Sequence, residues 1–171
     1  MSRKTRKITL AALFSAFSVV ILYIASVWPT GQLGLVAVSS VFVAAAVVEG
    51  GVTSGVSVFA VSSALGMLIV PNRVPPVLFI IFFGYYPVVK CIIERVRNVI
   101  MQWFLKLAIF NAALLVIWYF LSELFMSYTE SIPGTWLVYL LGSVVFVVYD
   151  YGFSKVIWLY ITRVSKHTTS P

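Results

Sequence analysis

Residues 3–28, RKTRKITLAALFSAFSVVILYIASVW, place four basic side chains directly before a long apolar run. No charged residue occurs between Ile8 and Val27, and about 20 residues at a rise of about 1.5 Å each are enough to cross a hydrocarbon core about 30 Å thick. A secretory signal peptide has a shorter apolar region, about 7 to 15 residues long, that ends at a small-residue cleavage site. This run is longer and ends in WPTG at residues 28–31, so we predict a retained membrane helix.

The composition of the whole chain is that of an integral membrane protein. Of its 171 residues, 61% are hydrophobic and 10% are charged, and the mean hydropathy is +1.05. Soluble domains typically carry about 25% charged residues. The formal net charge of +7 does not indicate nucleic-acid binding, because the basic residues stand at segment ends instead of forming a stripe with interleaved aromatic residues. The single cysteine, Cys91, excludes an internal disulfide.

Proline, glycine and polar residues divide the rest of the chain into further apolar segments. The breaks fall at residues 29–34, 49–51, 71–76 and 127–134, where Pro and Gly interrupt helices. The six predicted spans cover about residues 8–28, 32–48, 52–70, 76–90, 105–125 and 135–160. Pro87 should bend or loosen the last turns of the fourth span. Between spans four and five, apolar residues at helical spacing predict an amphipathic helix over residues 91–106, lying at the inner interface.

The distribution of basic residues predicts the orientation of these spans. If the N-terminus lies inside, only Arg73 falls in an outer loop. The inner flanks then carry the other eleven basic residues: Arg3, Lys4, Arg6, Lys7, Lys90, Arg95, Arg97, Lys106, Lys155, Arg163 and Lys166. Lys and Arg are retained on the cytoplasmic side during insertion. We therefore predict a single all-α membrane domain with six transmembrane helices and both termini in the cytoplasm.

The residue pattern does not indicate an enzyme. The sequence has no cluster of His, Cys and carboxylate residues, no phosphate-binding glycine loop, and no nucleophile with a plausible base. The only histidine, His167, lies in the C-terminal tail. A gating-charge array and a potassium-filter sequence are also absent. We expect neither catalytic residues nor a cofactor or metal site in this chain.

A ligand pocket is predicted near the outer ends of the helices. Polar groups among aromatic side chains are typical of small-molecule sites, and the candidates there are Trp28, Gln32, Asn72, Trp118, Tyr119, Glu123 and Trp136. Trp and Tyr also accumulate at membrane interfaces as anchors, and most of these aromatic residues are assigned to that belt. Gln32, Asn72 and Glu123 are therefore the leading candidates.

Asp150 is an acid within the predicted sixth span. An acidic side chain that faces lipid at this depth is costly, so it should face the bundle and pair with a donor. The donors considered are Asn111, Lys106 and Lys155. Ion coupling or a gate would be a functional explanation, but we favour a structural, hydrogen-bonded acid.

A face of small side chains, Ala12, Ser15 and Ala16, lies on the first predicted helix. Small residues at this spacing let a second helix backbone approach closely, which is how helices associate in lipid. The second helix could belong to the same bundle or to a partner. Because the motif is common, internal packing is the more frequent explanation when only the motif is considered.

The sequence RKITLAALFSAF at residues 6–17, together with six spans and cytoplasmic termini, resembles the substrate-binding S component of an energy-coupling-factor (ECF) transporter. The likeness covers the whole chain in layout and this one stretch in sequence. It implies that Ala12 and Ala16 dock onto a transmembrane T component, which sits on two cytoplasmic ATPase subunits. It also implies that a vitamin-like or other small molecule enters from outside, under a loop at residues 29–34, and that ATP is hydrolysed in the partner subunits. No vitamin-specific signature is recognised.

The composition of this chain does not distinguish an S component from a second class of membrane protein. The MreD family of bacterial cell-shape proteins also consists of small multi-span membrane proteins that resemble S components in fold. Its members act as scaffolds for wall synthesis and carry no substrate. A transporter should contain a polar cavity that opens outward, whereas a scaffold can be packed solid.

Overall fold

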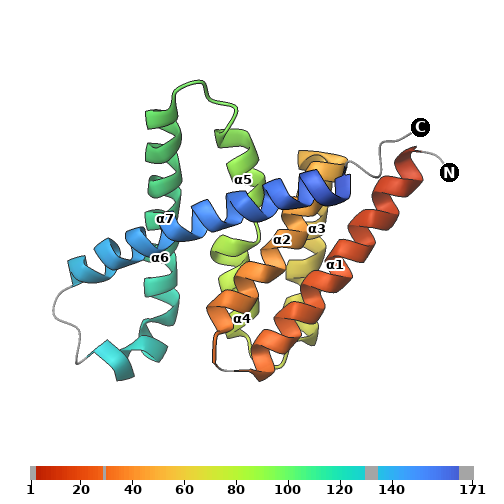
Figure 1. The fold of residues 1–171 in the computed structure, drawn as a ribbon. Coiled ribbons are helices and arrows are strands. Elements are labelled where there is room, and N and C mark those ends of the chain that lie inside the picture. Colours follow the sequence, from red (N-terminus) through yellow and green to blue (C-terminus); the bar gives the residue numbers. More distant parts are fainter. Residues whose placement is uncertain (1–2, 29, 130–134, 166–171) are drawn as a thin grey trace. The chain divides into compact units, whose positions relative to one another are not determined.

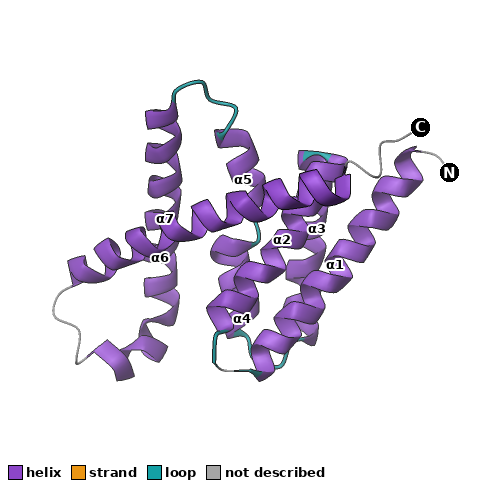
Figure 2. Cartoon of the chain, in the orientation of Figure 1, coloured by secondary structure: helices purple, strands orange, loops and turns teal. Residues whose placement is uncertain are grey.

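The computed structural model describes the backbone of residues 3–28, 30–129 and 135–165, and the side chains of residues 5–28, 30–117, 119 and 139–163. Across these residues the chain forms helices and short connections, with no strand (Figure 2). It divides into two compact units, Met1–Ile92 with Lys155–Pro171, and Ile93–Ser154. We call them unit 1 and unit 2 and describe each by itself.

Unit 1 is built on three helices that pack against one another, α1 (Arg3–Val27), α2 (Gln32–Gly50) and α3 (Val52–Ile69) (Figure 1). Its fully buried apolar side chains include Leu22, Val36, Val43 and Val58. Buried serines also join the helices, since the Ser18 hydroxyl donates to the Ser39 carbonyl at 2.7 Å. Small residues and interhelical hydrogen bonds therefore take part in this packing, as is usual for helices in membranes.

The corner between α2 and α3 is short because two glycines form it. Gly51 has a φ of +86°, a left-handed conformation that glycine adopts without steric cost. A Cβ atom on Gly50 would overlap the side chain of Ser54. The Gly50 carbonyl instead accepts a hydrogen bond from Lys7 Nζ at 3.2 Å, which ties the start of α1 to this corner.

The fourth span also packs within unit 1 and is irregular in its middle. It consists of α4 (Val74–Leu78), a π-helical turn η1 (Phe79–Phe83) and α5 (Tyr86–Ile93). The Gly84 amide donates to the Phe79 carbonyl at 2.6 Å, five residues earlier. Pro87 accounts for the break in the helix at residues 84–85, because it has no amide hydrogen for the Phe83 carbonyl and its ring would clash with that carbonyl. We expected Pro87 to bend or loosen the last turns of the span. The irregular turns lie directly before it, and α5, whose second residue is Pro87, is regular helix.

Unit 2 contains α6 (Val99–Thr129) and the first part of α7 (Thr135–Tyr160). Helix α7 continues as a π-helical turn, η2 (Ile161–Ser165), in unit 1. The rings of Phe110 and Phe146 stack between α6 and α7 with centroids 4.5 Å apart. A Cβ atom on Gly142 would lie 3.1 Å from Leu114. Aromatic stacking and a small residue thus allow α6 and α7 to approach closely.

The amphipathic helix expected over residues 91–106 is not continuous in the structure. Helix α5 ends at Ile93, residues 94–98 form a turn, and α6 begins at Val99. Two side chains account for the interruption: Asn98 Oδ1 accepts from the Ile100 amide at 3.0 Å, as an N-cap, and Gln102 Nε2 donates to the Val96 carbonyl at 2.7 Å. The apolar spacing across this segment therefore belongs to the ends of two helices.

Six described helical stretches are long and apolar enough to cross a membrane. They are Thr5–Val27, Gln32–Gly50, Val52–Ile69, Val74–Ile93, Val99–Ile117 and Tyr139–Arg163. Each of the six predicted spans overlaps one of these stretches. The prediction of an all-helical chain with six candidate membrane spans is therefore confirmed.

Candidate functional site

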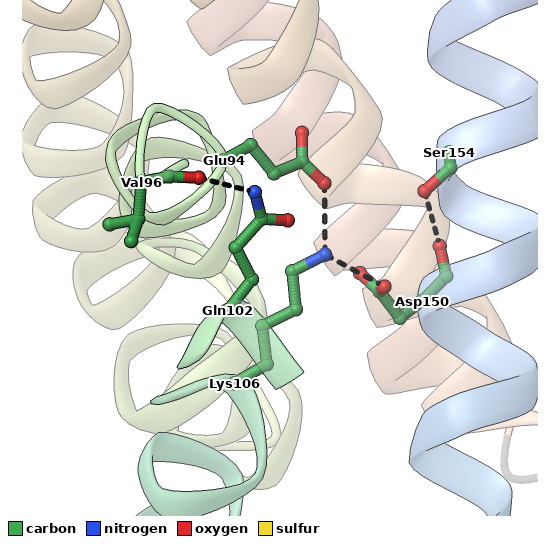
Figure 3. Close-up of polar contacts among 6 residues, drawn as sticks. All are labelled: Glu94, Val96, Gln102, Lys106, Asp150 and Ser154. Carbon is green, nitrogen blue, oxygen red and sulfur yellow. Dashed lines mark hydrogen bonds and ion pairs between the residues drawn. The ribbon is translucent and has the colours of Figure 1, made fainter. Parts of the chain in front are cut away.

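A cluster of charged side chains lies within unit 2 (Figure 3). Lys106 Nζ lies 2.9 Å from Glu94 Oε1 and 3.0 Å from Asp150 Oδ2. The exposed fraction is 6% for the side chain of Lys106 and 4% for that of Asp150, against 44% for Glu94. The cluster thus consists of a buried ion pair and a second carboxylate that reaches the surface of the unit.

Three separate elements bring these charges together. Glu94 stands in the turn after α5, Lys106 lies about two turns into α6, and Asp150 lies on α7. The ring of Trp103, one turn before Lys106, has its centroid 5.5 Å from Lys106 Nζ, close enough for a cation–π attraction. The Ser154 hydroxyl donates to the backbone carbonyl of Asp150 at 2.8 Å. Figure 3 shows both carboxylates turned toward the ammonium group.

Asp150 is buried, and Lys106, one of the three donors considered from the sequence, forms an ion pair with it. The Asn111 amide donates to the Leu107 carbonyl in its own helix, at 2.9 Å. A charged residue inside a membrane is stable when it pairs and faces other protein groups. The contacts of Asp150 therefore fit the structural role that we favoured.

The small-residue face of α1 is divided between the interior of unit 1 and its surface. Ser15 is buried, and its hydroxyl donates to the Ala11 carbonyl at 2.9 Å. Ala12 and Ala16 are exposed. Ala12 also lines a groove of about 440 Å³ between α1 and α3, whose lining residues are Lys7, Ile8, Ala11, Ala12, Ser15, Thr53, Ser54, Ser57 and Val61. Within unit 1, the two alanines are therefore left accessible by the packing of α1.

Exposed alanine pairs with the same spacing occur on two other helices. They are Ala60 with Ala64 on α3, and Ala108 with Ala112 on α6. Spacing and exposure alone therefore do not single out α1. Ala12 also lies in the wall of the groove between α1 and α3.

The residues predicted to line an outer pocket are placed as follows. In unit 1, Trp28 is exposed, Gln32 is partly buried in the first turn of α2, and Asn72 Oδ1 accepts from the Val74 amide at 3.0 Å, at the start of α4. In unit 2, the side chain of Tyr119 is exposed. The side chains of Trp118, Glu123 and Trp136 lie outside the described residues. The groove between α1 and α3 is lined by other residues, so the predicted outer pocket stays a prediction.

The sequence analysis missed several interactions of charged residues. Lys90 was assigned to an inner flank, but it is buried, with its Nζ 6.0 Å from the centroid of the Tyr86 ring. Glu49 lies 3.9 Å from Arg6 and accepts a 3.5 Å hydrogen bond from the Tyr160 hydroxyl, which joins α2 to both α1 and α7 within unit 1. Acidic residues are rare in this chain, and an acidic residue near a membrane span usually pairs with another group. The position of Glu49 at the end of a predicted span was therefore a signal for such a pair.

The described helices and their composition define a multi-pass membrane protein. Among the described residues, no group of three or more His, Cys, Asp or Glu side chains is arranged to hold a metal ion. Comparison of the chain with known protein families, with curated proteins and with solved structures finds no match.

Proposed function

We propose that this chain is the substrate-binding S component of an ECF-type importer in the cytoplasmic membrane of a bacterium. The observation that carries the proposal is the exposure of Ala12 and Ala16 on α1, where Ala12 lines the groove between α1 and α3. A partner helix can approach a surface of small side chains closely enough for van der Waals packing, which stabilises helix pairs in lipid. Packing within unit 1 leaves both alanines available for such a partner.

In this proposal the T component packs against α1, and two ATPase subunits on the cytoplasmic side supply the energy. The chain itself binds a small molecule from outside and releases it inward. The sequence contains no nucleotide-binding motif, so ATP hydrolysis belongs to the partners. Mass spectrometry of small molecules that copurify with the protein would identify the substrate.

The test replaces each exposed alanine of α1 with tryptophan and measures partner binding. We expect Ala12→Trp and Ala16→Trp to lower copurification of the T component and its ATPases, encoded by the same genome, by about tenfold or more, because a bulky side chain separates the two backbones. Thermal stability in detergent should stay close to that of the wild type, because both positions are exposed. Ala108→Trp and Ala112→Trp are matched controls with the same spacing and exposure on α6, and should keep the partners.

The outcomes separate the proposal from its rivals. Equal loss of partners in the α1 and α6 variants would show a general effect of tryptophan and would contradict docking on α1. Unstable α1 variants would indicate that these alanines pack within the protein. Stable α1 variants that retain every partner would exclude this docking face. Copurification with wall-synthesis proteins in place of ATPases would support the MreD-like scaffold.

The orientation of the helices is tested by labelling single cysteines in a Cys91→Ser background. We expect external labelling at residues 29–34, 71–76 and 127–134, and labelling only from the inside at both termini and residues 90–106. The reason is the excess of basic residues on the proposed inner flanks. A membrane-impermeant maleimide applied to intact cells, then to opened cells, reads out each position. A cysteine at position 97 that is labelled in intact cells would refute the proposed orientation.

A further inference from the structure

The groove between α1 and α3 has a definite direction relative to the membrane. Its lining runs from Lys7 to Ser15 on α1 and from Thr53 to Val61 on α3, which is eight helical steps of about 1.5 Å, or about 12 Å, along each helix. Both walls begin near the start of a candidate span, since the spans are Thr5–Val27 and Val52–Ile69. A hydrocarbon core is about 30 Å thick. The groove therefore extends from one membrane surface to about the middle of the bilayer, which is the depth of one leaflet.

The end of the groove at the membrane surface is cationic and rich in donors. Lys7 is the charged residue among those that line the groove, and its hydrogen bond to the Gly50 carbonyl holds the ammonium group beside the corner of α2 and α3. Thr53 and Ser54 provide hydroxyl groups on the opposite wall. The nearby acid Glu49 faces Arg6 at 3.9 Å and Tyr160 at 3.5 Å, and it does not line the groove. Ammonium and hydroxyl donors are suited to a phosphate group.

The deeper part of the groove offers few hydrogen-bond donors to a ligand, although two serines line it. The hydroxyl of Ser15 donates to the Ala11 carbonyl at 2.9 Å, and that of Ser57 donates to the Thr53 carbonyl at 3.0 Å. Because these hydrogen bonds stay within each helix, the two serines offer no hydroxyl hydrogen to a ligand. Ala12 and Val61 complete this part of the lining. It therefore suits a hydrocarbon chain.

We propose that this groove binds an anionic phospholipid from the leaflet on the N-terminal side, with its phosphate at Lys7 and one acyl chain between α1 and α3. The change from cationic to apolar lining follows the change from headgroup to tail in one leaflet. The site is a property of the isolated protein and goes beyond the proposed transport function, since it requires no partner subunit.

The test measures lipid binding to the purified full-length protein in detergent. Dioleoyl phosphatidylglycerol and dioleoyl phosphatidylcholine are titrated separately, and bound lipid is counted by native mass spectrometry. We expect the wild type to bind phosphatidylglycerol more tightly than phosphatidylcholine. Lys7→Gln should bind phosphatidylglycerol about fivefold more weakly, the usual effect of one basic residue near a membrane surface. Val61→Trp should abolish the preference for phosphatidylglycerol by filling the groove.

Two control variants make the result specific. Val56 lies on the same helix as Val61 and is equally exposed, at 47% against 46%, but it does not line the groove. Arg97 is an exposed basic residue in unit 2. We expect Val56→Trp and Arg97→Gln to bind phosphatidylglycerol as the wild type does. Equal binding of both lipids by the wild type, or equal weakening in groove and control variants, would overturn the proposal. Unchanged lipid binding in Lys7→Gln and Val61→Trp would also overturn it, and loss of the ATPase partners in those same variants would assign the groove to a partner helix.

Discussion

The Asp150→Leu variant is expected to lose about 3 to 5 kcal/mol of unfolding free energy, enough to remove most of the folded protein from the membrane. The physical reason is the ammonium group of Lys106, whose side chain is 6% exposed and lies 3.0 Å from the Asp150 carboxylate. Removing one partner of a buried ion pair leaves the other charge poorly compensated. Glu94 lies 2.9 Å from Lys106, but its side chain is 44% exposed, so it should compensate only in part. Unfolding monitored by tryptophan fluorescence in detergent measures the change.

Two further variants show whether the charge causes the loss. In Lys106→Met/Asp150→Leu both members of the pair are replaced by apolar groups, so stability should recover to within about 1 or 2 kcal/mol of the wild type. Asp150→Asn keeps a hydrogen-bond acceptor and should keep most of the folded protein. A double variant as unstable as Asp150→Leu would show that packing, and not charge, governs this position. Normal folding of Asp150→Asn with selective loss of uptake would favour a functional role for the acid.

The Gly84→Ala variant is expected to lose about 1 to 3 kcal/mol of unfolding free energy through overpacking. A Cβ atom at this position would lie 2.6 Å from Phe59 Cδ2 and 2.7 Å from Phe79 Cε1. Both rings belong to a packed aromatic group, since the Phe59 and Phe79 centroids are 6.1 Å apart. Gly84 also directly follows the π-helical turn that precedes Pro87, so its backbone has little freedom to move away. Chemical unfolding in detergent measures the loss.

A matched substitution and a rescue test this explanation. Gly34→Ala is the control, because Gly34 lies in α2 and a Cβ atom there would meet nothing within 4 Å. This variant should be neutral or more stable by up to about 1 kcal/mol, since alanine has the higher helix propensity. In the double variant Gly84→Ala/Phe59→Leu, the smaller side chain at position 59 should restore part of the lost unfolding free energy. If Gly84→Ala is as stable as Gly34→Ala, the proposed close approach of the two rings to Gly84 is wrong.

The number of spans and their approximate limits were predictable from the sequence. The first span was predicted over residues 8–28, and the corresponding candidate span of the structure is Thr5–Val27. Such limits depend on the length of each apolar run and on Pro or Gly near its ends, which are properties of neighbouring residues. The same reasoning was wrong for residues 91–106, because apolar spacing does not show where a helix is interrupted. The hydrogen bonds that stabilise the turn and the start of α6 involve single side chains, Gln102 and Asn98.

Contacts between helices were decided only by the tertiary structure. Helical spacing shows which residues share a face, but it does not show which other helix that face meets. Three donors were therefore open for Asp150, and the fold brings Lys106, 44 residues away in the chain, to 3.0 Å from its carboxylate. The sequence also did not determine which helix contacts the small-residue face of α1. The packing of α1 with α2 and α3 buries Ser15 and leaves Ala12 and Ala16 exposed. A span is a local property of the chain, whereas a partner depends on how separate helices pack.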